Sequence, residues 1–512
     1  MVLPAAAAKY GDKTALIVPE RAFSFRELDG LSSAVAASLV KLGVAPGDRV
    51  TLYAPNSWEW LVSYYGSLKT GAVINPINVM LTPAEVAYIT RDCGAKALIG
   101  SRDKLGPALE AGVTGLTTIA FGTEPLAGAI AFDELISKPA TFEPVAIDPG
   151  RPSTIGYTSG TTGHPKGAMQ SHRAVILNGA MTAQMHGKTA ADIVVTALPC
   201  PHVYGNVVFN GAMMYGLTLV LHSRFDAAEA LGSIQSHRAT MFEGVPTMYM
   251  YMLAHPDLER FELSTLSRCT VGGQTMPVAK MQEVEQRFGC PLIELWGMTE
   301  IAGLGTTFPS YGPHTLGSIG IALPHCEAKI ASVNDATVTM SAGEVGELMI
   351  KGPIVMMGYW GNEAATREVI EPDGWLHTGD LAYMDEDGFF RFVDRAKDLI
   401  IRGGENIFPV EIEGFLLKHP KVQDVAVMGY PHPRLVEIVM AVIQPREGET
   451  LTDEEVLEFC KEKGLAKFKW PEKMIYTKIP RNPAGKIEKP KLRDTYVKPA
   501  KEAMEKEFTK GG

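Results

Sequence analysis

The sequence predicts an α/β protein. Its large N-terminal domain has two layered α/β subdomains and a distorted β-barrel subdomain, and a small α+β domain follows. Three observations predict this fold. Strand and helix patterns alternate from residue 14 onward, as in layered, mostly parallel sheets. Residues 343–361 are strand-rich with many glycines, which favours a distorted barrel. The length of 512 residues also exceeds one compact core.

The first subdomain is expected to alternate short strands with helices. Strands are predicted at residues 14–17, 49–53, 72–76 and 97–100, and helices at 24–42, 58–70 and 82–93. Thr82, with Glu85 three residues later, predicts a capping box at the start of the last helix. Residues 101–150 are expected to be irregular and to carry no chemistry.

The rest of the chain continues this alternation. Strands are predicted at residues 191–197, 240–246, 268–277, 292–294, 389–395, 425–429, 438–443 and 474–477, and helices at 171–185, 410–417 and 452–463. The methionine-rich residues 207–221 are expected to form a buried helix and then a strand. The strand at 268–277 should break at Gly272 and Gly273, because consecutive glycines weaken a strand.

Composition and charge exclude several classes of protein. The net charge of −10 gives no reason to expect nucleic acid as a partner. Six scattered cysteines argue against a disulfide framework or a zinc site and fit a reducing compartment. No apolar run reaches the length of a membrane span, and the first residues do not open a signal peptide. We therefore expect a cytoplasmic protein.

Residues 153–167, S-T-I-G-Y-T-S-G-T-T-G-H-P-K-G, contain the parts of a polyphosphate grip. Glycines bring backbone N–H groups close to an anion, hydroxyls donate hydrogen bonds, and a lysine adds a point charge. These groups are Thr158, Ser159, Gly160, Thr161, Thr162, Gly163 and Lys166. The stretch is not a Walker A loop, because Gly167 follows the lysine where that motif needs Ser or Thr. A Ser/Thr/Gly linker is the alternative interpretation.

This stretch resembles the phosphate-binding signature of the acyl-adenylate-forming superfamily. That family holds the acyl-CoA synthetases, the adenylation domains of peptide synthetases and the beetle luciferases. Further stretches resemble its motifs in the same order, at residues 198–205, 268–277, 295–300, 374–380, 395–409 and 479–487. The chain looks most like bacterial short- to medium-chain acyl-CoA synthetases. The resemblance implies ATP, Mg²⁺ and coenzyme A as cofactors.

The resemblance also implies roles for individual residues. Lys486 matches the adenylation lysine, and His202 matches a gate that lines the acyl pocket. Thr299 would bond the α-phosphate, and Glu300 would hold Mg²⁺ together with Thr158. A magnesium ion on nucleotide phosphates uses one or two carboxylates, which agrees with this role. The remaining nucleotide- and acyl-binding positions are Gly273, Gln274, Trp296, Gly297, Met298, Asp380 and Arg395, of which Asp380 would bond the ribose.

The domain boundary is likewise implied by the resemblance. The N-terminal domain should span residues 1–396, and a mobile C-terminal domain with the catalytic lysine should span 397–512. Lys397 matches the hinge between them. Gly403 and Gly404 match backbone that lines the pantetheine tunnel, where side chains would block entry.

The acid to be activated is predicted from the motif at residues 295–300. Gly297 has no side chain to close the acyl tunnel, which favours a short- to medium-chain aliphatic acid, including branched ones, over acetate alone. An aryl acid–CoA ligase, or a stand-alone adenylation enzyme that loads a carrier protein, is the alternative. A luciferase-like oxygenase and a nucleotide-binding relative without catalysis also stay open. We expect a monomer or homodimer whose partners are a small-molecule carboxylic acid, ATP and CoA.

Overall fold

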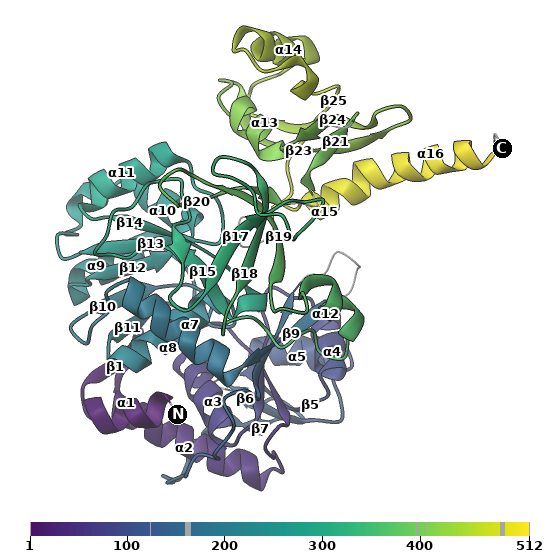
Figure 1. Cartoon of the computed structure of the whole chain (residues 1–512). Helices are drawn as coiled ribbons and strands as arrows, with labels where there is room; N and C mark the ends of the chain where they lie inside the picture. Colours follow the sequence, from purple (N-terminus) through teal and green to yellow (C-terminus); the bar gives the residue numbers. More distant parts are fainter. Residues whose placement is uncertain are drawn as a thin grey trace. The chain divides into compact units, whose positions relative to one another are not determined.

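A computed structural model describes residues 2–122, 124–158, 165–395, 398–403, 405–481 and 487–510. The chain divides into two compact units. The first unit holds residues 1–329 and 349–377, and the second holds residues 330–348 and 378–512. Figure 1 labels the helices and strands. The predicted α/β class is confirmed, because both large sheets of the first unit are mostly parallel.

The first large sheet has nine strands in the order β16-β15-β14-β13-β12-β10-β11-β1-β2. They are β1 (Thr14–Val18), β2 (Arg21–Ser24), β10 (Ile193–Thr196), β11 (Thr218–Leu221), β12 (Met241–Gly244), β13 (Arg268–Gly272), β14 (Leu292–Met298), β15 (Gly303–Thr307) and β16 (Ile321–Ala322). Its helices are α7 (His172–Met185), α8 (Val203–Tyr215), α9 (Ala227–His237), α10 (Pro246–Leu253) and α11 (Val278–Phe288). Figure 1 shows α7 and α8 on the side of this sheet away from α9–α11. Strands β10, β12, β13 and β14 run parallel, so their carboxyl ends share one edge.

The second large sheet has seven strands in the order β7-β6-β5-β3-β4-β8-β9. They are β3 (Arg49–Tyr53), β4 (Val73–Pro76), β5 (Ala95–Ser101), β6 (Thr117–Phe121), β7 (Ile130–Ala131), β8 (Pro152–Thr158) and β9 (Lys166–Ser171). The helices of this region are α1 (Val2–Tyr10), α2 (Phe25–Lys41), α3 (Trp58–Lys69), α4 (Pro83–Asp92), α5 (Arg102–Glu110) and α6 (Phe132–Ile136). The predicted capping box of α4 is confirmed, because Thr82 and Glu85 each bond the other's backbone N–H.

The prediction that residues 101–150 are irregular is wrong. They contain α5, β6, β7 and α6, and β6 pairs in parallel with β5 from Ala97 to Ser101. Leu105 and Ala108 of α5 are buried in the same core as Leu98 of β5. The helix also contains Pro107, which weakens its local signal. Tertiary packing and strand pairing therefore decide this segment.

The second unit contains a five-stranded sheet with a core on each face. Its strands are β21 (Ile400–Arg402), β22 (Glu405–Ile407), β23 (Val422–His432), β24 (Val436–Pro445) and β25 (Lys473–Tyr476). Val425 and Val427 pack with α13 (Pro409–Leu416) and α14 (Asp453–Glu462). The alternate residues Ala426 and Met428 pack on the other face, with Leu492 of α15 (Lys489–Leu492). This alternation is the period of two expected of a strand.

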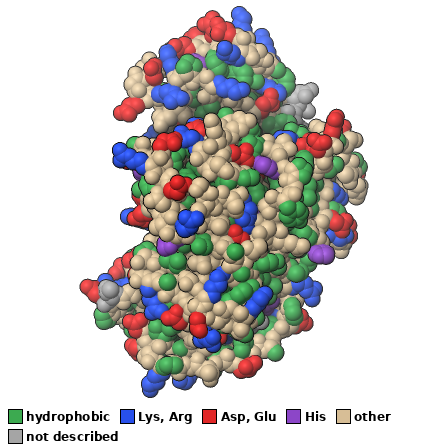
Figure 2. Space-filling view, turned by 90° about the vertical axis from the view of Figure 1, so that its left-hand side faces the viewer, with side chains coloured by type: hydrophobic (Ala, Val, Ile, Leu, Met, Phe, Trp, Pro, Cys, Tyr) green, Lys and Arg blue, Asp and Glu red, His purple; other side chains and the backbone are tan. Residues whose placement is uncertain are grey.

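The remaining elements complete the chain. A four-stranded sheet joins β17 (Glu327–Ala331), β18 (Gly346–Lys351), β19 (Leu376–Met384) and β20 (Phe390–Arg395) in that order. Helix α12 (Glu363–Val369) lies between β18 and β19, and helix α16 (Lys498–Lys510) follows α15. On the face in Figure 2, acidic and basic side chains are interspersed. Within the described ranges, no helix is long and apolar enough to cross a membrane.

Candidate active site

The predicted phosphate segment is framed by a β-hairpin. Strands β8 and β9 pair antiparallel up to Thr158 and Lys166, which lie opposite each other. The Thr158 hydroxyl donates to the Lys166 carbonyl oxygen over 3.5 Å. The ends of the two strands, on either side of residues 159–164, therefore lie close together. The predicted residues Ser159, Gly160, Thr161, Thr162 and Gly163 lie outside the described residues.

The Thr299–Glu300 motif packs against this hairpin, although β14 belongs to the other large sheet. Both residues lie in the 3-10 turn η2 (Thr299–Ile301), directly after β14. The Gln170 side-chain amide of β9 donates to the Thr299 carbonyl oxygen over 2.8 Å. A Cβ built on Gly156 of β8 would lie only 2.7 Å from Thr299 Cγ2, so a side chain there would push the two apart. Thus two motifs about 130 residues apart in sequence meet where the two sheets join.

Tyr359 connects Glu300 to the hairpin. The tyrosine hydroxyl donates to Glu300 Oε1 over 3.0 Å, and both residues are buried. Lys166 Nζ lies 5.2 Å from the centre of the Tyr359 ring, within reach of a cation–π interaction. Burial and the neighbouring Glu300 raise the pKa of Tyr359 well above its usual value, so the hydroxyl keeps its proton. The sequence analysis missed Tyr359 and Gln170, and only the glycine-rich context of residues 343–361 pointed to the tyrosine.

Glu300 suits the role of a magnesium ligand. It is a buried carboxylate that follows β14 and packs near the hairpin of β8 and β9, and a tyrosine holds one of its oxygens. The described part of the chain contains no group of three or more His, Cys, Asp or Glu that could hold a metal alone. Magnesium that is bound with nucleotide phosphates needs only one or two carboxylates, so the residues present fit this ion.

The carboxyl edge of the nine-stranded sheet collects the other predicted residues of the first unit. His202 follows β10, Gly273 and Gln274 follow β13, and Met298 ends β14. Gly273 has φ +85°, a left-handed conformation that glycine adopts readily. His202 is exposed and caps α8, because its Nδ1 accepts from the backbone N–H of Tyr204. Its role as an acyl gate stays a prediction.

Trp296 and Gly297 are shaped by the neighbouring strand β15. A Cβ built on Gly297 would lie 2.1 Å from the carbonyl oxygen of Gly303. A Cβ on Gly305 would lie 2.5 Å from the Trp296 ring, which is 8% exposed. The absence of a side chain at position 297 therefore has a packing reason that is independent of the acid.

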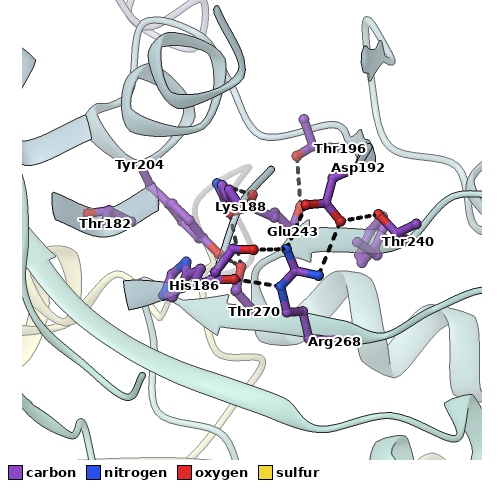
Figure 3. A network of polar contacts seen from close by, with 12 residues as sticks. Thr182, His186, Lys188, Asp192, Thr196, Tyr204, Thr240, Glu243, Arg268 and Thr270 are labelled. Atoms are coloured by element: carbon purple, nitrogen blue, oxygen red, sulfur yellow. Dashed lines mark hydrogen bonds and ion pairs between the residues drawn. The ribbon is translucent and has the colours of Figure 1, made fainter. Parts of the chain in front are cut away.

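Beneath this edge lies a buried polar network (Figure 3). Lys188 Nζ lies 2.5 Å from Glu243 Oε1, and both side chains are 1% exposed. Glu243 Oε2 accepts from the Thr270 hydroxyl, which also bonds the Tyr204 hydroxyl over 2.6 Å. Buried charges persist when they are paired and hydrogen-bonded, as here. The network links α8 to β12 and β13, and so it supports the strand ends that carry the candidate site.

A second buried ion pair lies close by in the same network. Arg268 of β13 donates from Nη2 and Nη1 to the two carboxylate oxygens of Asp192, over 2.9 and 3.2 Å (Figure 3). Arg268 also donates from Nε to the His186 carbonyl oxygen, and Thr240 donates to Asp192. These bonds lower the pKa of Asp192 even though burial opposes them.

The second unit brings two further predicted residues together. Asp380 of β19 lies opposite Arg395 of β20, and Arg395 Nε is 2.9 Å from Asp380 Oδ1. Asp380 is 2% exposed, whereas the Arg395 side chain is about half exposed. An arginine with one end on a buried carboxylate and the other in solvent is positioned to bind an anion or a diol beside it. Their contacts with ribose stay predictions.

Of the predicted coenzyme and hinge residues, Gly403 lies among the described residues, near the start of the five-stranded sheet. Gly403 has φ +59° and follows β21, and its N–H donates to the Leu435 carbonyl oxygen over 2.8 Å. Lys397, Gly404 and Lys486 lie outside the described residues. Asp398, next to the predicted hinge, pairs with Arg493 at 2.5 Å.

The layered α/β fold and the carboxyl edge of the nine-stranded sheet define a site suited to a phosphorylated nucleotide. The family model of the AMP-binding enzyme matches residues 3–360, and that of the AMP-binding enzyme C-terminal domain matches residues 411–486. The chain therefore belongs to the AMP-binding enzyme family, which confirms the resemblance seen in the sequence.

Named relatives are similar over nearly the whole chain. The mitochondrial medium-chain acyl-CoA ligase ACSF2 of Rattus norvegicus is 33% identical over 96% of this chain and 86% of its own. The indoleacetate–CoA ligase of Aromatoleum aromaticum is 34% identical over 95% of this chain and 96% of its own. The crystal structure of the anthranilate CoA ligase AuaEII with anthranoyl-AMP has a TM-score of 0.88 at 28% identity, covering 98% of this chain and 97% of that one.

Proposed function

We propose that this protein is an AMP-forming acid–CoA ligase that works through an acyl-adenylate. The observation that carries the proposal is the packing of Thr299 and Glu300 against the hairpin that frames residues 159–164. Tyr359 further connects the buried Glu300 carboxylate to Lys166 of this hairpin, which supports a place for nucleotide phosphates beside it. The family match and the names of the relatives, which are acid–CoA ligases, support the same conclusion.

In the first step, a carboxylate oxygen of the acid attacks the α-phosphorus of ATP, and pyrophosphate leaves. Thr299, the phosphate segment and Lys486 donate hydrogen bonds to the oxygens on which negative charge develops. Glu300 and Thr158 would hold Mg²⁺, which when bound offsets the charge of the phosphates. Asp380 and Arg395 would orient the ribose. Positioning of the carboxylate against the α-phosphorus supplies much of the remaining rate enhancement.

In the second step, the thiolate sulfur of CoA attacks the acyl carbon; the thioester bond forms as the bond to the phosphate oxygen breaks, and AMP leaves. We propose that the C-terminal domain, residues 397–512, turns about Lys397 between the steps. Lys486 then withdraws, and the backbone at Gly403 and Gly404 lines the path of the pantetheine arm. The left-handed conformation of Gly403 supports this assignment, since a residue with a side chain would be strained there.

We propose a short- to medium-chain aliphatic acid, including branched ones, as the substrate. The name of the rat relative supports this choice. An aryl acid is the alternative, and the indoleacetate and anthranilate ligases favour it. Gly297 does not distinguish an aliphatic from an aryl acid, because the close approach of β15 requires a glycine there for either substrate. A carrier protein in place of CoA is a further alternative. The six free thiols support a reducing compartment such as the cytoplasm, and we propose a monomer or homodimer.

The substrate is tested by pyrophosphate release across a panel of acids, with and without CoA. The panel runs from acetate to dodecanoate and includes isobutyrate, benzoate and a cinnamate. A maximum among short or medium aliphatic acids with CoA-dependent turnover is expected. A maximum with aryl acids would overturn the aliphatic assignment, and turnover without CoA would indicate carrier loading. No release of pyrophosphate with any acid would contradict the proposed ligase activity.

The role of Lys486 is tested by separating the two steps. Lys486→Ala should lower adenylate formation by about 100-fold or more, as expected for the loss of one charge-stabilising donor. Thioester formation from supplied acyl-adenylate and CoA should be unchanged. Lys491→Ala, which removes an exposed lysine of α15, is the matched control. Equal loss of both steps would contradict the assignment.

A further inference from the structure

The buried polar network of Figure 3 ends in a tyrosine that reaches from a helix to the sheet. Tyr204 lies in the first turn of α8, and its hydroxyl oxygen is 2.6 Å from the hydroxyl oxygen of Thr270 in β13. The side chain therefore spans the distance between the helix and the strand, and Figure 3 shows the ring pointing toward Thr270. Because the residue is only 4% exposed, its ring fills the interior between α8 and β13.

The hydrogen bonds of this network have a defined direction. The Thr270 hydroxyl donates to Glu243 Oε2 over 3.1 Å, which uses its only proton, so the Tyr204 hydroxyl donates to Thr270. Burial, followed by the charge of Glu243, raises the pKa of Tyr204 well above its usual value, so the hydroxyl keeps that proton. Glu243 in turn pairs with Lys188 over 2.5 Å. A displaced ring would leave buried polar groups without partners, and this opposes its movement.

The backbone of Tyr204 is held as firmly as its hydroxyl. Its N–H donates to His202 Nδ1 over 3.2 Å, and the His202 N–H donates to the Pro199 carbonyl oxygen over 2.9 Å. A Cβ built on Gly205 would lie 2.2 Å from the same carbonyl oxygen, so α8 begins in close contact with the preceding turn. The ring is therefore fixed at both of its ends.

The acyl site is expected on the outer side of this ring, at the carboxyl edge of the sheet. The predicted gate His202 lies two residues before Tyr204, and the predicted binding residue Gly273 lies three residues after Thr270. An acid tail that runs inward from this edge between α8 and β13 meets the aromatic ring. A buried ion pair lies behind the ring, and an apolar tail cannot replace the polar partners of buried charges.

We propose that Tyr204 closes the inner end of the acyl site and thereby limits the length of the acid. The Lys188–Glu243 pair, acting through Thr270, is the fixed support of the ring. The inference rests on the proposed function, and it narrows the substrate to short-chain aliphatic acids, including branched ones. Tyr204 is then a specificity-determining residue that contacts the acid tail and takes no part in the bond changes.

The test compares Tyr204→Leu with Tyr249→Leu in pyrophosphate release with acids from acetate to dodecanoate. Leucine shortens the side chain and keeps the site apolar, and each methylene of the acid that gains burial contributes about fourfold to kcat/KM. With room for two or more methylenes, the ratio of kcat/KM for octanoate to that for butanoate should rise by about 10-fold or more in Tyr204→Leu. The KM for ATP should not change.

Tyr249 offers a matched control on the opposite face of the same sheet. It is also buried, and its hydroxyl donates to the Thr270 carbonyl oxygen over 2.7 Å. It belongs to α10, which lies on the side of the sheet away from α8 (Figure 1). Tyr249→Leu should therefore leave the ratio of octanoate to butanoate as in the wild type, even where it lowers stability.

A milder variant and a measurement without turnover keep the inference falsifiable. Tyr204→Phe loses only the hydroxyl, so it keeps the core filled. It should raise the same ratio by up to about fivefold, because one buried hydrogen bond no longer opposes movement of the ring. Calorimetric titration with octanoate, in the presence of AMP and without CoA, should show about 10-fold tighter binding to Tyr204→Leu than to the wild type.

Three results would overturn the inference. The first is a wild-type ratio of octanoate to butanoate in both Tyr204 variants. The second is an equal shift in Tyr249→Leu, which would mean that a loosened core is responsible. The third is a wild type that works best with dodecanoate. If the wild type releases no pyrophosphate with any acid, the proposed function fails instead, and unchanged octanoate binding in Tyr204→Leu would then overturn the inference by itself.

Discussion

Tyr359→Phe tests how Glu300 is held. The substitution removes one hydroxyl and keeps the ring, so the contact of Lys166 with the ring is retained. The lost hydrogen bond joins the Tyr359 hydroxyl to Glu300 Oε1 over 3.0 Å, with both residues less than 10% exposed. Hydrogen bonds to charged groups contribute about 1.5–3 kcal/mol, and partners that orient a metal ligand are worth about 10- to 100-fold in metal affinity.

We therefore expect the Mg²⁺ concentration that gives half the maximal rate to rise by about 10-fold or more in Tyr359→Phe. The assay is the initial rate of pyrophosphate release against free Mg²⁺, at saturating ATP and acid. Tyr476→Phe is the matched control, because Tyr476 bonds the Asp453 carboxylate over 2.8 Å in the second unit. Glu300→Gln should show a larger rise than Tyr359→Phe.

The reasoning is refuted if Tyr359→Phe responds to Mg²⁺ as the wild type does. In that case the tyrosine does not orient the carboxylate. If Glu300→Gln also responds as the wild type does, Glu300 is not the magnesium ligand. An equal effect of Tyr476→Phe would show that the loss is not specific to this site.

Three further predictions concern packing, pH and thiol chemistry. Gly297→Ala would place a Cβ 2.1 Å from the Gly303 carbonyl oxygen, so it should lower the free energy of unfolding by about 1–3 kcal/mol and lower activity with all acids alike. Urea unfolding and the acid panel measure these two effects. A loss of activity that is selective for acetate would contradict the reasoning. Burial, followed by the charges of Lys188 and Arg268, lowers the pKa of His186 well below 6.5. Only the unfolded chain then binds a proton at this imidazole, so the free energy of unfolding should decrease as the pH drops below about 6.5. The decrease in wild type should exceed that in His186→Gln by up to about 1.4 kcal/mol per pH unit. Urea midpoints of the two proteins that change in parallel between pH 7 and pH 5.5 would contradict this. Burial raises the pKa of Cys326 to about 11, and this thiol is the least buried of the six cysteines, so alkylation of native protein should begin there and quicken from pH 7 to pH 9; rapid labelling at pH 7, followed by mass spectrometry, would contradict it.

Much of the fold could be predicted from local signals. The capping box of Thr452 and Glu455 begins α14 as expected, and β3 spans the predicted residues 49–53. Such signals act within a few residues, so no distant contact is needed to interpret them. Residues 101–150 had no comparable signal, because their helix and strands are stabilised by pairing with β5 and by a shared core.

The sequence by itself determined the family and predicted the chemical groups of the site, because its motifs keep their residue types in order along the chain. It named Thr299, Glu300 and Asp380 without showing their neighbours. Only the tertiary structure decided that Tyr359 holds Glu300 and that Asp424 holds Arg481. Each of these pairs is separated by more than 50 residues in the chain. Such partners meet only once strand order and register are set, and one side chain in each pair lies in a stretch that carries no motif of its own.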